Sequence, residues 1–162
     1  VLVTGWGVTT TQTLGAALTA RGQTATVAET GTTPSAARIA EVAALAAAND
    51  LVVVSTNNAG SINVATGQPT ASAAAQQAFV RALVATGKPV VVAGMRNPYD
   101  VSYLPTAQTY LATYGYTAGQ VESLARVLYG EVNPNGKLPV TIPKADGSGA
   151  LYPFGHGLRY GS

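Results

Sequence analysis

The sequence has 162 residues, the size of one domain with a substantial core. Only 10% of the residues are charged and 47% are hydrophobic, so neutral polar side chains must cover much of the surface. The nine basic and seven acidic residues are scattered singly, which excludes the basic stripe of a nucleic-acid-binding protein. No cysteine is present, which excludes disulfides and thiolate metal sites, and no apolar run is long enough for a membrane span. We therefore expect neither nucleic acid nor membrane as a partner.

The sequence starts inside a strand pattern at Val1, with neither an initiator Met nor a signal peptide. We therefore expect residues 1–162 to form a single domain of a longer polypeptide. The surface rich in Thr and Ala and free of cysteine is compatible with a secreted or extracytoplasmic parent protein.

Short apolar runs predict six strands, at residues 1–4, 24–28, 51–55, 89–94, 109–114 and 138–142. Runs such as LVVV and PVVVAG are apolar on both faces, which is typical of a sheet covered by helices on both sides. The intervening segments have helical periodicity, for example Val121, Leu124, Ala125 and Leu128. Thr33 is expected to cap a helix whose first turn contains Pro34.

This alternation of strands and helices predicts an α/β fold, a three-layer α/β/α sandwich of the flavodoxin-like type. We expect a mostly parallel six-stranded sheet with the order 2-1-3-4-5 and an antiparallel sixth strand at its edge. The sixth strand should return antiparallel because residues 130–137 (GEVNPNGK) are too few for a crossover helix.

The first loop, Gly5-Trp6-Gly7, leaves two interpretations open. It follows a strand and precedes a helix, and Glu29 ends the second strand, as in a nucleotide- or flavin-binding module. However, Thr10 replaces the third glycine of that fingerprint, and Trp6 is bulky at a place where a pyrophosphate needs close approach. The alternative is that the two glycines only allow a tight strand-to-helix turn.

The sequence does not contain the motifs of several common catalytic and metal sites. There is no Walker loop and no nucleophile elbow, and His156 is the only histidine, so no metal site is expected. His156 is expected to bind backbone in a tight turn near the C-terminus.

Polar residues follow the third and fourth strands, where a parallel sheet presents its crevice. Asn57 and Asn58 follow the third strand, and Arg96, Tyr99 and Asp100 follow the fourth. Together with Trp6 they are expected to face either a ligand or a neighbouring domain. An ion pair between Arg96 and Asp100 that only ties the loop is the alternative.

The second half of the sequence resembles the C-terminal domain of glycoside hydrolase family 3. The resemblance is carried by residues 97–100 (NPYD), 133–141 (NPNGKLPVT) and 151–160 (LYPFGHGLRY). It implies retaining hydrolysis of β-linked sugars through a covalent glycosyl-enzyme, with the nucleophilic Asp on an N-terminal TIM-barrel domain of the same polypeptide. No cofactor is implied.

The resemblance also separates two branches of the family. In the glucosidase-like branch, this domain lends a Glu acid/base from the loop after the third strand. In this sequence the corresponding residues include Asn57 and Asn58 and no acid, and an amide does not transfer a proton at neutral pH. The departure favours the β-N-acetylhexosaminidase-like branch, whose His-Asp dyad lies on the barrel.

The chain would then hold no catalytic residue and would pack against the barrel, wall an oligosaccharide cleft or form a homodimer surface. A noncatalytic carbohydrate-binding or oligomerisation module is the remaining alternative.

Overall fold

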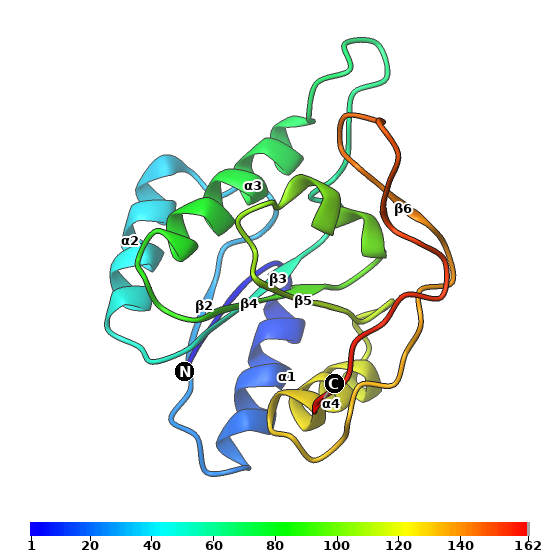
Figure 1. Ribbon diagram of the computed structural model, residues 1–162. Coiled ribbons are helices and arrows are strands. Elements are labelled where there is room, and N and C mark those ends of the chain that lie inside the picture. The colour runs from blue at the N-terminus through cyan, green and yellow to red at the C-terminus, as the bar shows by residue number, and fades with distance from the viewer. Residues whose placement is uncertain (162) are drawn as a thin grey trace.

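The computed structural model describes residues 1–161, which form a parallel sheet between two layers of helices (Figure 1). Five strands form this sheet: β1 (Leu2–Gly5), β2 (Thr26–Glu29), β3 (Val52–Thr56), β4 (Val90–Gly94) and β5 (Thr109–Ala112). All pairs are parallel, in the order β2-β1-β3-β4-β5. The predicted fold class and the order 2-1-3-4-5 are therefore confirmed.

Four α-helices and one 3-10 helix connect the strands. They are α1 (Val8–Thr19), α2 (Ala36–Ala47), α3 (Ala71–Val84), α4 (Ala118–Leu128) and the 3-10 helix η1 (Pro98–Tyr103). The cap of α2 differs from the expectation, because Ser35 and not Thr33 accepts the backbone N–H of Arg38. Pro34 is thus outside the helix, in the extended segment that leads into it.

The alternation of side chains along each strand divides the core into two halves. Val53 of β3 packs on one face with Leu14 of α1 and Leu124 of α4. Val52 and Val54 point to the other face, where Phe79 of α3 and Val42 of α2 cover them. These seven side chains are at most 4% exposed. This double coverage explains why the strands are apolar at consecutive positions.

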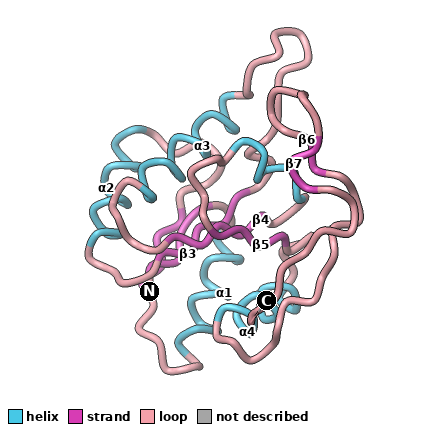
Figure 2. Tube along the Cα trace, in the orientation of Figure 1, coloured by secondary structure: helices cyan, strands magenta, loops and turns pink. Residues whose placement is uncertain are grey.

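The expected sixth strand does not join the main sheet. Residues Ile142–Pro143 form β6, which pairs antiparallel with β7 (Ala150–Tyr152) in a separate small sheet (Figure 2). The backbone N–H of Leu138 donates to His156 O, and the N–H of Gly155 donates to Leu138 O. Pro139 and Pro143 have no N–H to offer to a longer ladder, so this segment pairs with the C-terminal tail instead of β5.

None of the helices within residues 1–161 combines the length and the hydropathy that crossing a membrane requires.

The glycine at the end of β1 is required by close packing of β1 against β3. Gly5 has φ +101, and a Cβ atom there would lie 2.2 Å from the carbonyl oxygen of Ser55. Neither the backbone angle nor the space tolerates a side chain.

We expect Gly5→Ala to lower the free energy of unfolding by at least about 2 kcal/mol, because backbone strain and a backbone clash add. Gly22→Ala is the matched control, since Gly22 has φ +84 and open space around it. The control should cost about 1 kcal/mol, from backbone strain alone. Urea unfolding of both variants checks this, and equal losses would contradict a role of Gly5 in packing.

Candidate functional site

The carboxyl ends of the parallel strands meet at one edge of the sheet, where the candidate residues lie. The loops after β1, β3, β4 and β5 all emerge there. The 3-10 helix η1 starts at this edge, directly after β4, and lies beside β6. The paired strands therefore fix the starting points of the loops that form this edge.

Asp100 of η1 lies beneath this edge and joins it to the end of β3. Its side chain is 1% exposed. The hydroxyl of Thr56 donates to Asp100 Oδ2 at 2.8 Å, and the backbone N–H of Gly60 donates to Oδ1 at 3.0 Å. Burial raises the pKa of this carboxyl, while the hydrogen bonds from Thr56, Ala59 and Gly60 oppose the rise. Asp100 thus fixes the loop after β3 against η1.

The ion pair considered between Arg96 and Asp100 does not occur. Arg96 is exposed, whereas Asp100 is buried. The ion pairs within residues 1–161 involve Arg21, Arg38 and Arg126 instead. The loop is tied by hydrogen bonds to a carboxylate rather than by a charge pair.

Two asparagines bridge the loops after β3 and β4. Asn97 Nδ2 donates to Asn58 Oδ1 at 2.8 Å, and Asn97 Oδ1 accepts the backbone N–H of Tyr99 at 3.0 Å, which caps η1. Asn58 has φ +56, a left-handed conformation that asparagine tolerates better than most residues. Both amides are thereby oriented by the fold.

Asn57 is held by its backbone. The buried side chain of Gln76 accepts from Asn57 N at 2.9 Å and donates to Asn57 O at 3.0 Å. Gln76 belongs to α3, so this bidentate contact fixes the loop after β3 to the helix that follows it.

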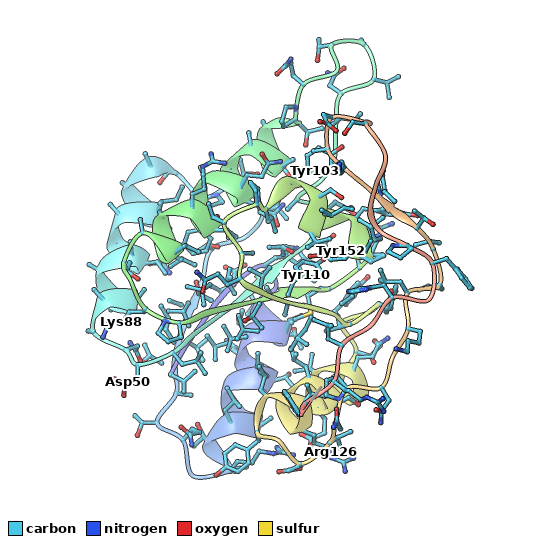
Figure 3. The ribbon with its side chains drawn as sticks, in the orientation of Figure 1. Asp50, Lys88, Tyr103, Tyr110, Arg126 and Tyr152 are labelled. Atoms are coloured by element: carbon cyan, nitrogen blue, oxygen red, sulfur yellow. The ribbon has the colours of Figure 1, made fainter. Side chains whose placement is uncertain are left out.

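A cavity of about 300 Å³ opens between these two loops. It is lined by neutral polar and aromatic residues together with buried Asp100: Asn58, Gly60, Ser61, Asn97, Tyr99, Asp100, Ser102, Tyr103 and Pro143. Figure 3 shows Tyr103 on η1 and, below it in this view, Tyr110 on β5. The Tyr110 hydroxyl donates to Asn97 O at 3.3 Å. Amides, hydroxyls and aromatic rings of this kind can bind an uncharged polar ligand.

Trp6 lies at the same edge but outside the cavity. Its half-buried ring packs edge-on against Tyr116 of the loop before α4, with ring centroids 5.0 Å apart. Its backbone is fixed by Ser55, which accepts from Trp6 N at 3.0 Å and donates its hydroxyl to Trp6 O at 2.7 Å. The structure therefore brings Asn58, Tyr99 and Asp100 together and separates Trp6 from them.

The first loop has roles within the chain that account for its glycines. Gly5 allows close contact with β3, and Gly7 is the N-cap of α1 at φ +92. Glu29, the candidate ribose ligand, accepts the backbone N–H of Gly31 at 2.8 Å. The geometry therefore supports the tight-turn interpretation.

The single histidine and the acidic residues offer no metal site in the described chain. The His156 ring stacks on Tyr152, with centroids 4.7 Å apart. Its backbone N–H donates to Pro153 O, as expected for a tight turn. Within residues 1–161 no group of three His, Asp or Glu side chains could hold an ion.

Sequence reasoning missed several residues of this edge. In the sequence, Thr56 and Gln76 resemble ordinary strand and helix residues. Only their polar character among apolar neighbours indicates that they form buried hydrogen bonds. Tyr103 and Ser102 line the cavity because η1 turns them toward it. A short 3-10 helix has no periodicity that a sequence pattern reveals.

Solved structures with similar folds include two enzymes. One is a glycoside hydrolase family 3 β-N-acetylglucosaminidase from Paenibacillus sp., with 27% identity and a TM-score of 0.67 over 81% of this chain and 25% of that chain. The other is a fungal multi-domain family 3 β-N-acetylglucosaminidase, with 26% identity and a TM-score of 0.66 over 94% of this chain and 16% of that one.

Curated relatives share sequence over about half of the chain. A putative β-xylosidase of Formosa agariphila is 34% identical over 109 residues, which cover 53% of this chain and 14% of that protein. A periplasmic β-glucosidase of Salmonella typhimurium is 30% identical over 118 residues, which cover 52% of this chain and 15% of that protein. The chain therefore matches only a small part of each relative.

The family model of the glycosyl hydrolase family 3 C-terminal domain matches residues 2–160, nearly the whole sequence. Together with the sheet order and the similar folds, this match shows that the chain belongs to the family of glycosyl hydrolase family 3 C-terminal domains.

Proposed function

We propose that the chain is the C-terminal domain of a glycoside hydrolase that cleaves β-N-acetylhexosaminides, and that it supplies neither the nucleophile nor the acid/base. In this proposal it packs against an N-terminal barrel of the same polypeptide and walls part of the sugar cleft with the edge that carries Asn58, Arg96 and Tyr99. The two similar structures that are β-N-acetylglucosaminidases support the choice of substrate.

One observation carries the proposal: the loop after β3 has no acid. Residues 57–69 contain neither Asp nor Glu. A general acid must hold a transferable proton within hydrogen-bond reach of the leaving oxygen. The amides of Asn57 and Asn58 do not meet this requirement, so the acid/base must come from elsewhere in the enzyme.

Asp100 is the carboxyl group of the cavity, and its environment is unsuited to proton transfer to a substrate. Both of its oxygens accept hydrogen bonds from the fold, and the side chain is 1% exposed. A substrate would have to displace Thr56 or Gly60 to reach it. We assign Asp100 a structural role.

A second candidate activity is hydrolysis of β-xylosides or β-glucosides. It is favoured by the sequence similarity to a putative β-xylosidase and a periplasmic β-glucosidase. The acid-free loop after β3 counts against it, because the resemblance implies that the glucosidase-like branch of the family takes its acid/base from that loop.

The substrate assignment is tested with nitrophenyl glycosides. The parent polypeptide that carries this chain should hydrolyse the N-acetyl-β-glucosaminide with a higher kcat/KM than the β-glucoside or β-xyloside. The isolated 162-residue chain should release no chromophore from any of them. Preference for the xyloside would support the second candidate. Turnover that copurifies with the isolated chain would refute the claim that it lacks catalytic groups.

The structural role of Asp100 predicts a pH-dependent stability. Its pKa is raised in the folded state above the ordinary value of 3.8, so the folded protein binds more protons than the unfolded one just above that pH. The free energy of unfolding should therefore fall as pH rises through this window and be flat above the folded pKa. Asp100→Asn should remove this part of the pH dependence in urea unfolding between about pH 4 and pH 8.

The two variants of Asp100 should also differ at neutral pH. Asn retains an acceptor for Gly60 N–H and can donate to the Thr56 hydroxyl, so Asp100→Asn should stay within about 1 kcal/mol of the parent chain. Asp100→Ala leaves both donors unpaired and should cost about 2 kcal/mol. Equal losses in the two variants would show that the charge itself is needed.

A further inference from the structure

The sequence contains one Asn-Gly pair, Asn135-Gly136, in the irregular segment that follows α4. The side-chain amide of an asparagine can be attacked by the backbone nitrogen of the residue that follows it. Glycine at that position hinders the attack least, because it has no Cβ atom and the widest choice of backbone angles. In a folded protein, the attack also requires that the two residues are free to move.

The peptide between Asn135 and Gly136 is not held by hydrogen bonds. Both residues are exposed, and residues 133–138 belong to no helix or strand. Within residues 1–161, no hydrogen bond is formed by the Gly136 N–H, the Asn135 carbonyl oxygen or the Asn135 side chain. The peptide can therefore rotate and bring the Gly136 nitrogen to Asn135 Cγ without breaking a hydrogen bond.

The surroundings of Asn135 favour this reaction. Asn135 lies in the wall of a cavity of about 210 Å³ whose other lining residues are Pro134, Lys137, Leu158 and Arg159. This space can hold water beside the amide. Lys137 Nζ donates to Gly157 O at 3.2 Å, which positions its ammonium group. A nearby positive charge stabilises the anionic nitrogen that attacks and the carboxylate that finally forms.

The other asparagines are less suited to the attack. They are Asn49, Asn57, Asn58, Asn63, Asn97 and Asn133. Asn97 and Asn133 precede prolines, whose nitrogen has no proton to lose. The remaining four precede residues with a Cβ atom, which hinders the approach of the backbone nitrogen.

The pair Asp146-Gly147 is a comparison within the same chain, because an aspartate can close the same ring. Here the Gly147 N–H donates to Lys144 O at 3.0 Å, and Asp146 Oδ1 accepts the Ser148 N–H at 2.9 Å. The hydrogen bonds from Ser148 lower the pKa of the Asp146 carboxyl, and an ionised carboxylate resists a nucleophile. The fold therefore restrains this pair on both sides of the bond that would have to rotate.

The segment around Asn135 holds the C-terminal tail, and Figure 1 shows the two running side by side next to α4. On one side of Asn135, the Asn133 side chain accepts the Tyr160 N–H at 3.0 Å and donates to Tyr160 O at 3.2 Å. On the other side, the Leu138 N–H donates to His156 O at 2.8 Å. Asn135 thus lies between two attachments of the tail.

We propose that Asn135-Gly136 is a site of spontaneous deamidation, and that its isoaspartate product weakens the attachment of residues 153–160 to the domain. The Gly136 nitrogen loses its proton and bonds to Asn135 Cγ, while the Cγ–Nδ2 bond breaks and the amide nitrogen leaves as ammonia. Water then opens the cyclic imide at either carbonyl, which gives aspartate or isoaspartate. In sum, asparagine and one water become an acid and ammonia, and nothing is oxidised or reduced.

Isoaspartate changes the main chain as well as the charge. Its backbone runs through Cβ and Cγ of the former side chain, so the chain gains one methylene group between Asn133 and Leu138. The two attachments of the tail then no longer have the spacing that both require. Ordinary aspartate adds the same charge and keeps the backbone length. The reaction needs only water and this chain, so it is independent of glycoside hydrolysis.

The test is incubation of the 162-residue chain in ¹⁸O-labelled water at mildly alkaline pH, followed by peptide mapping with mass spectrometry. Position 135 should lose ammonia and gain one labelled oxygen faster than any other asparagine reacts, while Asp146 should not isomerise. Gly136→Ala should slow the reaction at least about tenfold, because a Cβ atom hinders the nitrogen. This variant should fold normally, since Gly136 lacks a positive φ and a Cβ atom there meets no neighbour within 4 Å.

Three results of this mapping would overturn the assignment of the site. They are equal rates in the parent chain and Gly136→Ala, faster conversion at another asparagine, and isomerisation of Asp146 at the same rate.

The effect on the tail is measured by hydrogen exchange of the purified isoaspartate form. The N–H groups of Leu138 and Tyr160 should exchange at least about fivefold faster than in the parent chain, because the tail opens more readily. Freshly purified Asn135→Asp is the matched control, which has the new charge on an unchanged backbone and should exchange within about twofold of the parent. Unchanged exchange in the isoaspartate form would overturn the proposed weakening. Equally fast exchange in Asn135→Asp would contradict the role of the longer backbone.

Discussion

A buried carboxylate that forms no ion pair within residues 1–161 holds the candidate site together. Asp100 accepts from the Thr56 hydroxyl and the Gly60 backbone, and thereby joins the end of β3 to η1. Removing a carboxylate from water is costly, and these hydrogen bonds offset part of that cost. Because these contacts hold Thr56 and Gly60, they restrain the residues between them. The left-handed Asn58, which contacts Asn97, lies between these two attachment points.

The chemistry of the edge follows from this constraint. The Asp100 carboxylate accepts hydrogen bonds from Thr56 and Gly60. The other polar groups that line the cavity are amides, hydroxyls and phenols. Such groups bind and orient a polar ligand but do not exchange protons readily near neutral pH. These properties support the proposed function, in which this domain contributes to recognition and the covalent chemistry lies elsewhere in the polypeptide.

The sequence predicted the sheet well because its signal is strong and local. Strands that are buried on both faces must be continuously apolar, and each strand from β1 to β5 falls within a residue or two of its expected place. The sixth strand was wrongly assigned to the sheet, because a β-like pattern does not reveal its partner. Pro139 and Pro143 interrupt the ladder, and the tail from residue 150 onward competes for pairing.

The candidate site was harder to predict than the fold. Ligands of parallel sheets bind beyond the carboxyl ends of the strands, and this rule predicted Asn58, Tyr99 and Asp100 as site residues. These three residues line one cavity. The same rule also predicted Trp6, which lies at the same edge but packs on Tyr116. The positive φ of Tyr114 was not predicted, because tyrosine rarely adopts a left-handed conformation.

The claim that the nucleophile lies outside this chain is tested most directly by trapping the glycosyl-enzyme. The parent polypeptide would be inactivated with a fluorinated glycoside that leaves the sugar on the nucleophile, and the labelled peptide would be located by mass spectrometry. Our account predicts that the label lies on a carboxylate outside residues 1–162. A label on Asp100, or on any other residue of this chain, would contradict it.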